Sequence, residues 1–367
     1  IDVITVPDIG ESVFSLLEDG KIGCIVYTGA LLDSTVDDYI ALHRRALCHA
    51  VPCFTSLDTA NASADTIAGR YSQLNTELVD INHMRKERMT LKFAKMQGTG
   101  DDYIFIENFD GKITCPESLC ISLCDRHYGI GGYGIVLLEK SDVADVKMRM
   151  FNRDGSEGSM AGSCIRCTGK YLYDKGIVKN EKIKVETASG IKDLELYISN
   201  GRVSLVSVDM GRAMLLPSEV PCSLNLQRAV NVPVDIGGST YSITCLSMGN
   251  PHCVVFCDRV DGVDIEKTGP LFEHSPIFPS GVNTEFVRVV NESTLKMRVW
   301  ERGSGETMAC GTGACAAAVA AVLNGFCKKG SDITVKVRGG DLTVNYTDER
   351  VVLTGDAKLV YDGVTEF

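Results

Sequence analysis

The sequence predicts an α+β protein in which a region of two similar lobes follows a shorter α/β segment. Three observations carry this prediction. From Leu91 onward, short strands rich in Val, Ile, Phe and Tyr alternate with glycine-rich turns. Within that region a strand–loop–helix unit occurs twice. Before it, apolar strands flank a helical stretch, and the polar residues 70–88 are predicted to be a linker between the two regions.

The α/β segment, with its linker, is assigned to residues 1–85. Its predicted elements are an apolar strand, a helix and a second strand, at residues 22–27, 38–50 and 52–56. This order is typical of part of a Rossmann-like unit.

The internal repeat in the second region can be read directly from the sequence. Residues 148–157 align without a gap on residues 297–306, and methionine, arginine, an aromatic residue, a second arginine and glutamate coincide. In the same register residues 160–163 fall on residues 309–312, which places Ala161 on Cys310. A helix is predicted to begin at the following glycine in both copies, at residues 162–173 and 311–323.

Composition and charge limit the classes of function. The chain of 367 residues is 44% hydrophobic and 23% charged, and it contains no apolar run long enough to span a membrane. A net charge of −11 without a Lys/Arg block argues against nucleic acid or an anionic membrane as the partner. Residues 1–12 carry no signal sequence, so we expect a cytoplasmic protein with 15 free thiols and a small-molecule partner.

The start of the second repeated helix points to chemistry. Cys310 directly precedes Gly311-Thr312-Gly313, where the N–H groups at the positive end of a helix are exposed. A thiol at such a position is expected to have a lowered pKa, which makes Cys310 the first candidate for a nucleophile or base. Its alternative role is that of a small buried hydrophobic residue.

Two facing lobes suit the inversion of a carbon centre. One group removes a proton from one face of the substrate, and a second group returns a proton from the opposite face. Without a pyridoxal cofactor an α-proton is weakly acidic, so donors aimed at the substrate carboxylate must stabilise the carbanion. The paired helix starts are predicted to supply these donors.

Seven ordered motifs in the second region resemble the diaminopimelate epimerase family. They lie at residues 92–103, 125–132, 151–157, 248–253, 281–286, 301–307 and 309–314. The resemblance implies two pseudo-symmetric lobes, residues 91–215 and 216–367, each a β-barrel-like sheet around a central helix. It also implies a cofactor-independent enzyme without a metal, a homodimer as one assembly to consider, and interconversion of LL- and meso-2,6-diaminopimelate for lysine and peptidoglycan biosynthesis.

The resemblance also implies which residues contact the substrate. The residues assigned to its charged ends are Asn152, Asn250, Asn283, Glu301 and Arg302. Such an amino acid needs carboxamides, a carboxylate and a guanidinium, and arginine can bind a carboxylate through two parallel hydrogen bonds. The amides of Gly311 and Thr312 are expected to grip a carboxylate, and Asp101, Gly162 and Ser163 complete the predicted contacts. His252 is expected to be a hydrogen-bonded structural histidine beside the site.

Four positions depart from the family pattern on the expected substrate side. The first-lobe motif of the family carries an acid/base cysteine followed by Gly-Asn, whereas this chain has Ala161 and then Ser163. Asp101 replaces an asparagine, and Tyr133 replaces an aspartate. Because alanine cannot transfer a proton, the second acid/base must be another group, and the candidates are Tyr133, Cys164 or a water.

The first region is similar to the last half of the methylglyoxal-synthase-like domain that closes carbamoyl-phosphate synthase large subunits. The similarity covers residues 16–26, 39–50 and 51–55, and the family's phosphate loop is absent. A docking or linker module is therefore expected rather than an effector site. Three functions remain open for the chain: the diaminopimelate epimerase, a same-fold racemase or isomerase of another amino or carboxylic acid, and a catalytically inactive binding or regulatory protein.

Overall fold

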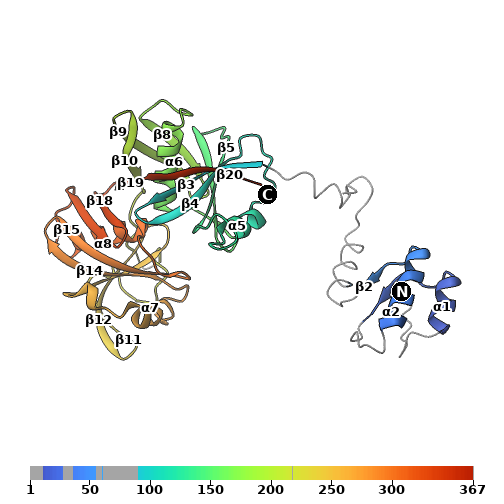
Figure 1. Cartoon of the computed structure of the whole chain (residues 1–367). Coiled ribbons are helices and arrows are strands. Elements are labelled where there is room, and N and C mark those ends of the chain that lie inside the picture. Colours follow the sequence, from blue (N-terminus) through green and yellow to red (C-terminus); the bar gives the residue numbers. More distant parts are fainter. Residues whose placement is uncertain (1–10, 28–35, 55–59, 61–89, 217, 367) are drawn as a thin grey trace. The chain divides into compact units, whose positions relative to one another are not determined.

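The computed structural model describes residues 11–27, 36–54, 60, 90–216 and 218–366. The chain divides into two compact units, Ile1–Arg88 and Met89–Phe367. In Figure 1 the described elements of the smaller unit are blue and those of the larger unit run from cyan to red. Each unit is considered by itself.

The smaller unit has two helices and a short parallel sheet. In chain order its elements are α1 Glu11–Glu18, β1 Ile25–Val26, α2 Val36–Cys48 and β2 Cys53–Phe54. Ile25 pairs with Cys53 and Val26 with Phe54, and a parallel pair of this kind needs a crossover, which contains α2. The helices pack through Val13, Leu17, Leu42 and Ala46. The predicted strand at 22–27 is therefore observed only over two residues, and residues 55–56 of the other predicted strand lie outside the described residues.

The larger unit contains most of the strands and the remaining helices. Its first half comprises β3 Thr90–Gly98, β4 Asp101–Glu107, α5 Pro116–Cys124, β5 Gly134–Glu139, β6 Val146–Asn152, β7 Glu157–Gly158, α6 Gly162–Asp174, β8 Lys182–Thr187, β9 Gly190–Ser199 and β10 Arg202–Asp209. Its second half comprises β11 Val232–Ile236, β12 Ser239–Ser247, β13 Pro251–Phe256, η1 Val260–Gly262, α7 Ile265–Glu273, β14 Asn283–Asn291, β15 Thr294–Glu301, β16 Gly305–Glu306, α8 Gly311–Leu323, β17 Asp332–Val337, β18 Gly340–Tyr346, β19 Val351–Asp356 and β20 Lys358–Glu366.

These elements confirm the predicted α+β class and the two predicted helices, now α6 and α8. Helices α5 and α7 were not predicted. Helix α5 is short and begins at Pro116, and α7 carries Gly269 and Pro270, residues that normally argue against a helix. Both helices form because they bury Leu119, Leu123 and Phe272 against neighbouring strands, so packing outweighs local preference.

The order of strand pairings occurs twice along the larger unit. In the first half β3–β4 is antiparallel, β4–β5 parallel, β5–β6 antiparallel, β6–β8 parallel and β8–β9 antiparallel. In the second half β12–β13, β13–β14, β14–β15, β15–β17 and β17–β18 follow the same sequence of orientations. An antiparallel pairing of β10 with β19 joins the halves, and β20, from the end of the chain, returns to pair with β3.

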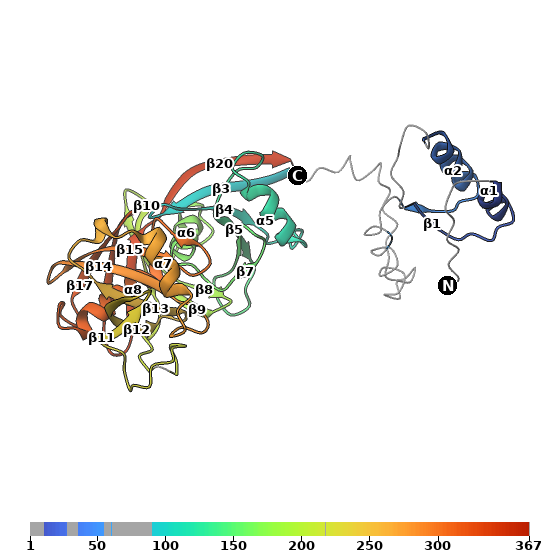
Figure 2. The ribbon, with the colours of Figure 1, turned by 90° about the horizontal axis from the view of Figure 1, so that it is seen from below.

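Helices α6 and α8 lie within the strands of their own halves, as Figures 1 and 2 show. Helix α6 packs mainly on β3 and β10, and α8 on β14 and β18. Helix α8 is built largely of alanine and is buried on all sides rather than along one stripe. The helices meet at their first residues: a Cβ added at Gly162 would lie 3.2 Å from Cα of Gly311. This contact brings two helix N-termini to one place.

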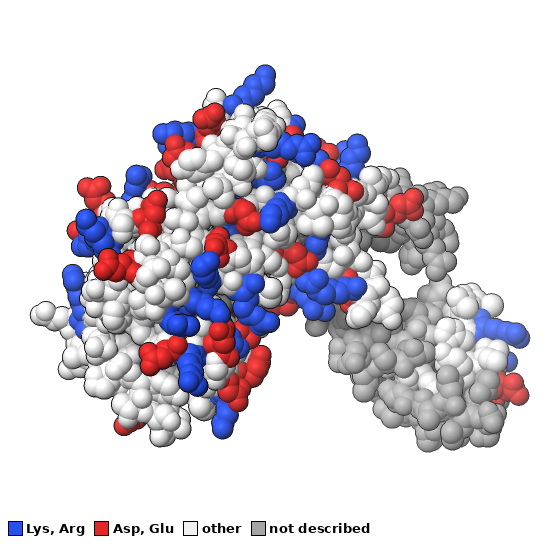
Figure 3. Space-filling model, turned by 60° about the vertical axis from the view of Figure 1, so that its left-hand side comes forward, with Lys and Arg blue, Asp and Glu red and all other residues white. Residues whose placement is uncertain are grey.

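The surface of the larger unit carries charges of both signs. Figure 3 shows Lys and Arg interspersed with Asp and Glu over the face in view, without a broad patch of either sign. None of the helices in the described segments is long and apolar enough to cross a membrane.

Candidate active site

Cys310 is the residue immediately before α8. Its backbone is extended (φ −132°, ψ 114°), and its sulfur accepts a hydrogen bond from the Gly313 N–H at 3.4 Å. The Thr312 hydroxyl lies 3.4 Å from the same sulfur. The side chain is only 6% exposed. The predicted placement of Cys310 at the positive end of a buried helix therefore agrees with the structure.

The predicted direction of the Cys310 pKa is wrong. Burial raises the pKa of this thiol well above its usual value, and the carboxylates of Glu301 and Glu285 raise it further. Hydrogen bonds from Thr312 and from the Gly313 N–H act in the opposite direction but are the smaller effects. Cys310 therefore rests as a protonated thiol, which suits a proton donor better than a nucleophile.

Glu301 lies beside this thiol at the end of β15. Its carboxylate accepts a hydrogen bond from the Thr307 hydroxyl at 2.5 Å. Burial raises the pKa of Glu301, and interactions with Thr307 and Cys310 partly offset the shift. The Glu301 carboxyl and the Cys310 thiol are thus neighbours at the start of α8, each affecting the pKa of the other.

A buried hydrogen-bonded chain supports the same helix start. His252 Nδ1 lies 2.7 Å from Glu285 Oε1, and His252 Nε2 lies 2.9 Å from Asn250 Oδ1. Asn250 Nδ2 donates to the Thr312 hydroxyl at 3.3 Å. His252 therefore acts as the structural histidine that was expected. Glu285 was missed because one acidic residue in an apolar strand has no local signature; burial raises its pKa to about 7.

The start of α6 has the same backbone form but a different chemistry. Ala161 occupies the position that Cys310 has before α8, with φ −121° and ψ 139°, and its side chain makes no capping hydrogen bond. Two residues later the Ser163 hydroxyl lies near the carboxyl of Asp101 and lowers its pKa. Asp101 is the first residue of β4 and is half-buried.

The buried guanidinium of Arg166 holds this part of the site together. Its Nη2 donates to the Thr99 hydroxyl at 2.6 Å and its Nη1 to the Gly162 carbonyl at 2.9 Å. Its Nε donates to the Asp356 carbonyl at 3.2 Å. These bonds fix the β3–β4 turn, which carries Asp101, against the first turn of α6.

Asp101 has a strongly perturbed carboxyl group. Burial raises its pKa to about 7, and the Glu301 carboxylate contributes to the rise, as does Asp102. The Ser163 hydrogen bond and the charge of Arg166 oppose the shift. A carboxyl group with this pKa changes its protonation state near neutral pH.

Tyr133 and Cys164, the two side chains among the candidates for a second acid/base, lie in different surroundings. Tyr133 is 40% exposed, and the Arg126 guanidinium lies 5.6 Å from its ring centre. Partial burial and the Asp101 carboxylate raise the pKa of the Tyr133 phenol. Cys164 is fully buried in the core beside the Tyr103 hydroxyl, and burial raises its pKa well above the usual range.

The other residues predicted to bind the substrate form hydrogen bonds with neighbouring parts of the protein. Asn283 donates to the Pro251 carbonyl at 3.0 Å and accepts from the Arg302 N–H at 2.9 Å. The guanidinium of Arg302 is exposed and donates to the Ser280 carbonyl at 2.8 Å. Asn152 bonds the Ser156 hydroxyl within its own turn at 3.0 Å. The structure thus groups Asp101, Ser163, Glu301, Thr312 and Cys310, while Asn152 and Arg302 make contacts outside that group.

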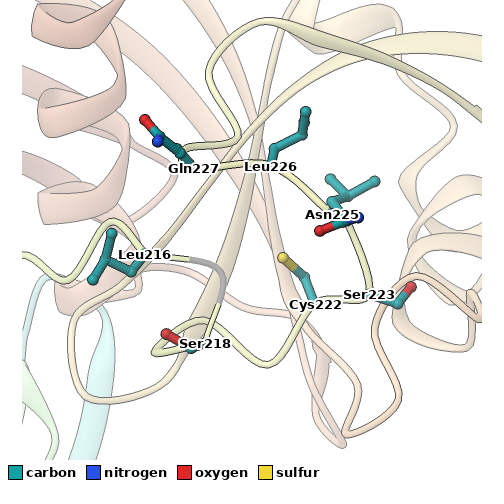
Figure 4. Close-up of a pocket in the computed structure, with 8 residues that line it drawn as sticks. Leu216, Ser218, Cys222, Ser223, Asn225, Leu226 and Gln227 are labelled. Carbon is teal, nitrogen blue, oxygen red and sulfur yellow. The ribbon is translucent and has the colours of Figure 1, made fainter.

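A surface pocket lies away from this group of residues. It has a volume of about 470 Å³ and is formed by the loop between β10 and β11, with Leu216, Cys222 and Gln227 among its lining residues (Figure 4). None of the acid/base candidates lines it. Over the described residues no group of three or more His, Cys, Asp or Glu side chains is arranged to hold a metal ion.

Comparisons with known proteins place this geometry in a family. The family model described as diaminopimelate epimerase matches residues 93–216 and 244–360. A diaminopimelate epimerase of Acetivibrio thermocellus is 48% identical over 275 residues, which are 74% of this chain and 98% of that protein. The diaminopimelate epimerase of Desulfovibrio desulfuricans is 47% identical over 283 residues, covering 75% of this chain and 98% of that protein.

Solved structures share the fold at much lower sequence identity. A PhzF-family phenazine biosynthesis protein of Bacillus anthracis superposes with a TM-score of 0.57 at 15% identity, covering 76% of this chain and 99% of that chain. A hydroxyproline epimerase from Agrobacterium vitis gives a TM-score of 0.55 at 14% identity, covering 77% and 93%.

Proposed function

The chain belongs to the diaminopimelate epimerase family, and from this we propose that its larger unit interconverts LL- and meso-2,6-diaminopimelate without an organic cofactor or a metal. One α-carbon loses its proton on one face and regains a proton on the other. Relatives that are named for this reaction at 47–48% identity support the substrate. The observation that carries the mechanism is the pairing of a buried thiol with two helix N-termini that meet.

The two halves of the larger unit are proposed to act as pseudo-symmetric lobes, residues 91–215 and 216–367. The repeated order of strand pairings and the contact between Gly162 and Gly311 support this arrangement. The substrate α-carbon would lie near the meeting point of α6 and α8. Each lobe would then contribute one group to one face of the carbon.

The helix N-termini are proposed to bind the α-carboxylate of the substrate. Backbone N–H groups at Gly162, Ser163, Gly311 and Thr312 lie in the first turns of α6 and α8, where the helix dipoles favour negative charge. When the α-proton leaves, its electron pair is delocalised onto this carboxylate, and the same donors stabilise the added charge.

The distal end of the substrate is proposed to contact the outer residues of the site. Arg302 is exposed and presents a planar guanidinium that can bind a carboxylate through two parallel hydrogen bonds. Asn152, Asn250, Asn283 and Glu301 offer amide and carboxyl groups for the ammonium and carboxylate ends. Asn250 and Asn283 are already fixed by protein hydrogen bonds, which would preorganise their remaining contacts.

Cys310 is proposed to protonate one face of the carbanion. The S–H bond breaks, a C–H bond forms with the electron pair of the carbanion, and a thiolate remains. In the reverse reaction the thiolate removes the proton from that face. The second face needs another group, because Ala161 carries no ionisable atom.

The test is NMR of the purified protein with LL- and meso-diaminopimelate in D₂O. The native chain should exchange the α-proton and interconvert the isomers, whereas Cys310→Ala should lose interconversion by roughly 10²–10⁴-fold. Cys315→Ala is the matched control, because Cys315 lies buried further along the same helix, outside the proposed site. Unchanged interconversion in Cys310→Ala would contradict the assignment.

The departures at Asp101, Tyr133 and Ser163 favour a second candidate, a racemase or isomerase of another amino or carboxylic acid. The same experiment separates the possibilities. Exchange with a different amino or carboxylic acid, but not with diaminopimelate, supports the second candidate. Saturable binding without exchange supports an inactive binding protein.

A further inference from the structure

We propose that the Asp101 carboxyl is the second acid/base group and faces the substrate carbon from the side opposite Cys310. This inference rests on the epimerase function proposed above. It assigns to a strand residue of the first half the proton transfer that Ala161 cannot perform, and it names a group outside the initial candidates Tyr133, Cys164 and water.

The strand register shows which residue of the second half corresponds to Asp101. Paired residues form a matching line across three strands of each half: Ile104, Ile135 and Phe151 in the first, and Cys253, Thr284 and Trp300 in the second. Asp101 lies three residues before Ile104 in the chain, and Asn250 lies three residues before Cys253. Asp101 and Asn250 are therefore counterparts.

Both counterparts interact with a hydroxyl at a helix start. Asn250 Nδ2 donates to the Thr312 hydroxyl, two residues after Cys310. The Asp101 carboxyl lies near the Ser163 hydroxyl, two residues after Ala161, and this hydroxyl lowers its pKa. The second half thus combines an amide on the strand with a thiol at the helix, whereas the first half combines a carboxyl on the strand with a methyl group at the helix. The ionisable group therefore lies on the strand in the first half and before the helix in the second half, and in both halves it is where the strand start meets the helix start.

Asp101 and Cys310 lie near a common neighbour and on different halves. Glu301 interacts with Cys310 and acts electrostatically on Asp101. Gly162 and Gly311, one residue beyond the two cap positions, are in contact. A carbon held by both helix N-termini would therefore have a carboxyl group from one half and a thiol from the other.

The charges around Asp101 suit a group that both accepts and donates a proton. Glu301 on β15 and Asp102 on β4 favour the protonated form, and Arg166 on α6 favours the carboxylate. Tyr133 and Cys164 also interact with Asp101, and Asp101 raises the pKa of both. Burial is the largest effect and, together with these charges, raises the pKa of Asp101 to about 7, so both protonation states are available at neutral pH.

The other two candidates fit the task less well. Cys164 is fully buried within the core and contacts the Tyr103 hydroxyl, so a substrate carbon cannot reach its sulfur without unpacking α6. Tyr133 is accessible, but its pKa is raised above that of an ordinary phenol, and a phenol is a poor base at neutral pH when its pKa lies that high.

The proton balance of the step is complete. The Asp101 carboxylate takes the α-proton from one face and becomes a carboxylic acid, and the electron pair passes to the substrate carboxylate. The Cys310 S–H then protonates the other face and becomes a thiolate. Asp101 then releases its proton to solvent and the Cys310 thiolate takes a proton from solvent, which restores the pair; the reverse reaction uses the carboxylic acid as donor and the thiolate as base.

The direct test compares Asp101→Asn with the double variant Asp101→Asn/Ala161→Cys. Asp101→Asn should lose interconversion by roughly 10²–10⁴-fold. In D₂O it should retain exchange of only one isomer, the one whose α-proton faces Cys310. Restoring a thiol at position 161 should recover part of the lost interconversion. Asp110→Asn is the matched control, because Asp110 is exposed and pairs with nearby Lys112.

The outcomes separate this inference from the proposed function. If the native chain interconverts the isomers and Asp101→Asn does so equally well, Asp101 is not the second acid/base although the epimerase function stands. If Tyr133→Phe abolishes interconversion and Asp101→Asn does not, the tyrosine holds the role. If the native chain shows no exchange with either isomer, the proposed function itself fails.

A pH profile gives a second readout that a purely structural role would not change. Both directions require the pair to hold one proton in total, so kcat/KM should rise with pH through about 7, where Asp101 ionises, in both directions. It should fall only at the higher pH where the Cys310 thiol ionises. In the double variant both groups are thiols, so the rising limb near pH 7 should move to higher pH. A limb that stays near 7 would assign it to another group, such as Glu285, and overturn the proposal.

Discussion

Replacing Gly162 with alanine tests whether the contact between the two helix starts sets the geometry of the site. The added Cβ would lie 3.2 Å from Cα of Gly311 and 3.2 Å from Cδ2 of Leu353. Leu353 can rotate its side chain, but Cα of Gly311 is backbone. The start of α8 must therefore move away from α6, and both carry proposed carboxylate donors.

Gly162→Ala is expected to lower both the unfolding free energy and the catalytic efficiency. Overpacking costs roughly 1–3 kcal/mol of unfolding free energy. Alanine offsets at most the ~0.5–1 kcal/mol that separates it from glycine in a helix, which leaves a net loss of about 0–2.5 kcal/mol. For activity, a displacement of about 1 Å costs on the order of 10²-fold, so a shift of a fraction of that distance should lower kcat/KM roughly tenfold.

Gly169→Ala is the matched control in the same helix. Its Cβ would meet side-chain atoms only, at 2.9 Å from Leu194 and 3.0 Å from Leu196, far along α6 from the site. It should lose a similar amount of stability without losing kcat/KM. Urea unfolding can be followed by the fluorescence of Trp300, the only tryptophan of the chain. Full kcat/KM in Gly162→Ala, or equal activity losses in both variants, would refute the reasoning.

Two further predictions concern the surroundings of the site. Burial raises the pKa of Glu285 to about 7 from an unfolded value near 4.5. The unfolded chain therefore releases this proton first, and the native protein should lose on the order of 3 kcal/mol of unfolding free energy as the pH rises from about 4.5 to 7. In urea unfolding, the native protein should be less stable at pH 7.5 than at pH 5 by this amount, and Glu285→Gln should not show this difference. Arg302→Lys should lower kcat/KM by roughly tenfold or more, chiefly through KM, because lysine cannot make two parallel hydrogen bonds; an unchanged KM would argue against Arg302 as a substrate contact.

The position of the site along the chain could be predicted from the sequence because each copy of the repeat is one continuous segment. Matching strand, turn and helix start in two segments identified Cys310 and its counterpart Ala161, and those segments fold into corresponding positions before α8 and α6. Glycine at the first helical position is favoured in both copies because Gly162 and Gly311 approach closely. The two glycines are visible in the sequence, but the contact between the two helix starts that explains them is visible only in the structure.

The electrostatics of the site depend on distant residues and were not predictable in the same way. The helix dipole alone predicts a lowered pKa for the Cys310 thiol, whereas burial of the thiol, followed by the charges of Glu301 from β15 and Glu285 from β14, raises it. Glu285 lies opposite Val299 in the sheet and is entirely buried. Its position near the thiol follows from the pairing of β13, β14 and β15, a long-range result that no local pattern encodes.

The changes at positions 101 and 161 are better understood together than separately. A cysteine before α6 would place a second thiol beside the Asp101–Ser163 contact, so two acidic groups would compete for one face of the substrate. In a buried region that already contains Glu301 and Glu285, neighbouring acids raise each other's pKa, and one of the two would stay protonated and idle. With alanine at position 161, only Asp101 has to change its protonation state on that side, and Arg166 keeps its pKa from rising further. The same charges that raise the pKa of Cys310 therefore favour one carboxyl and one thiol over two thiols and a carboxyl.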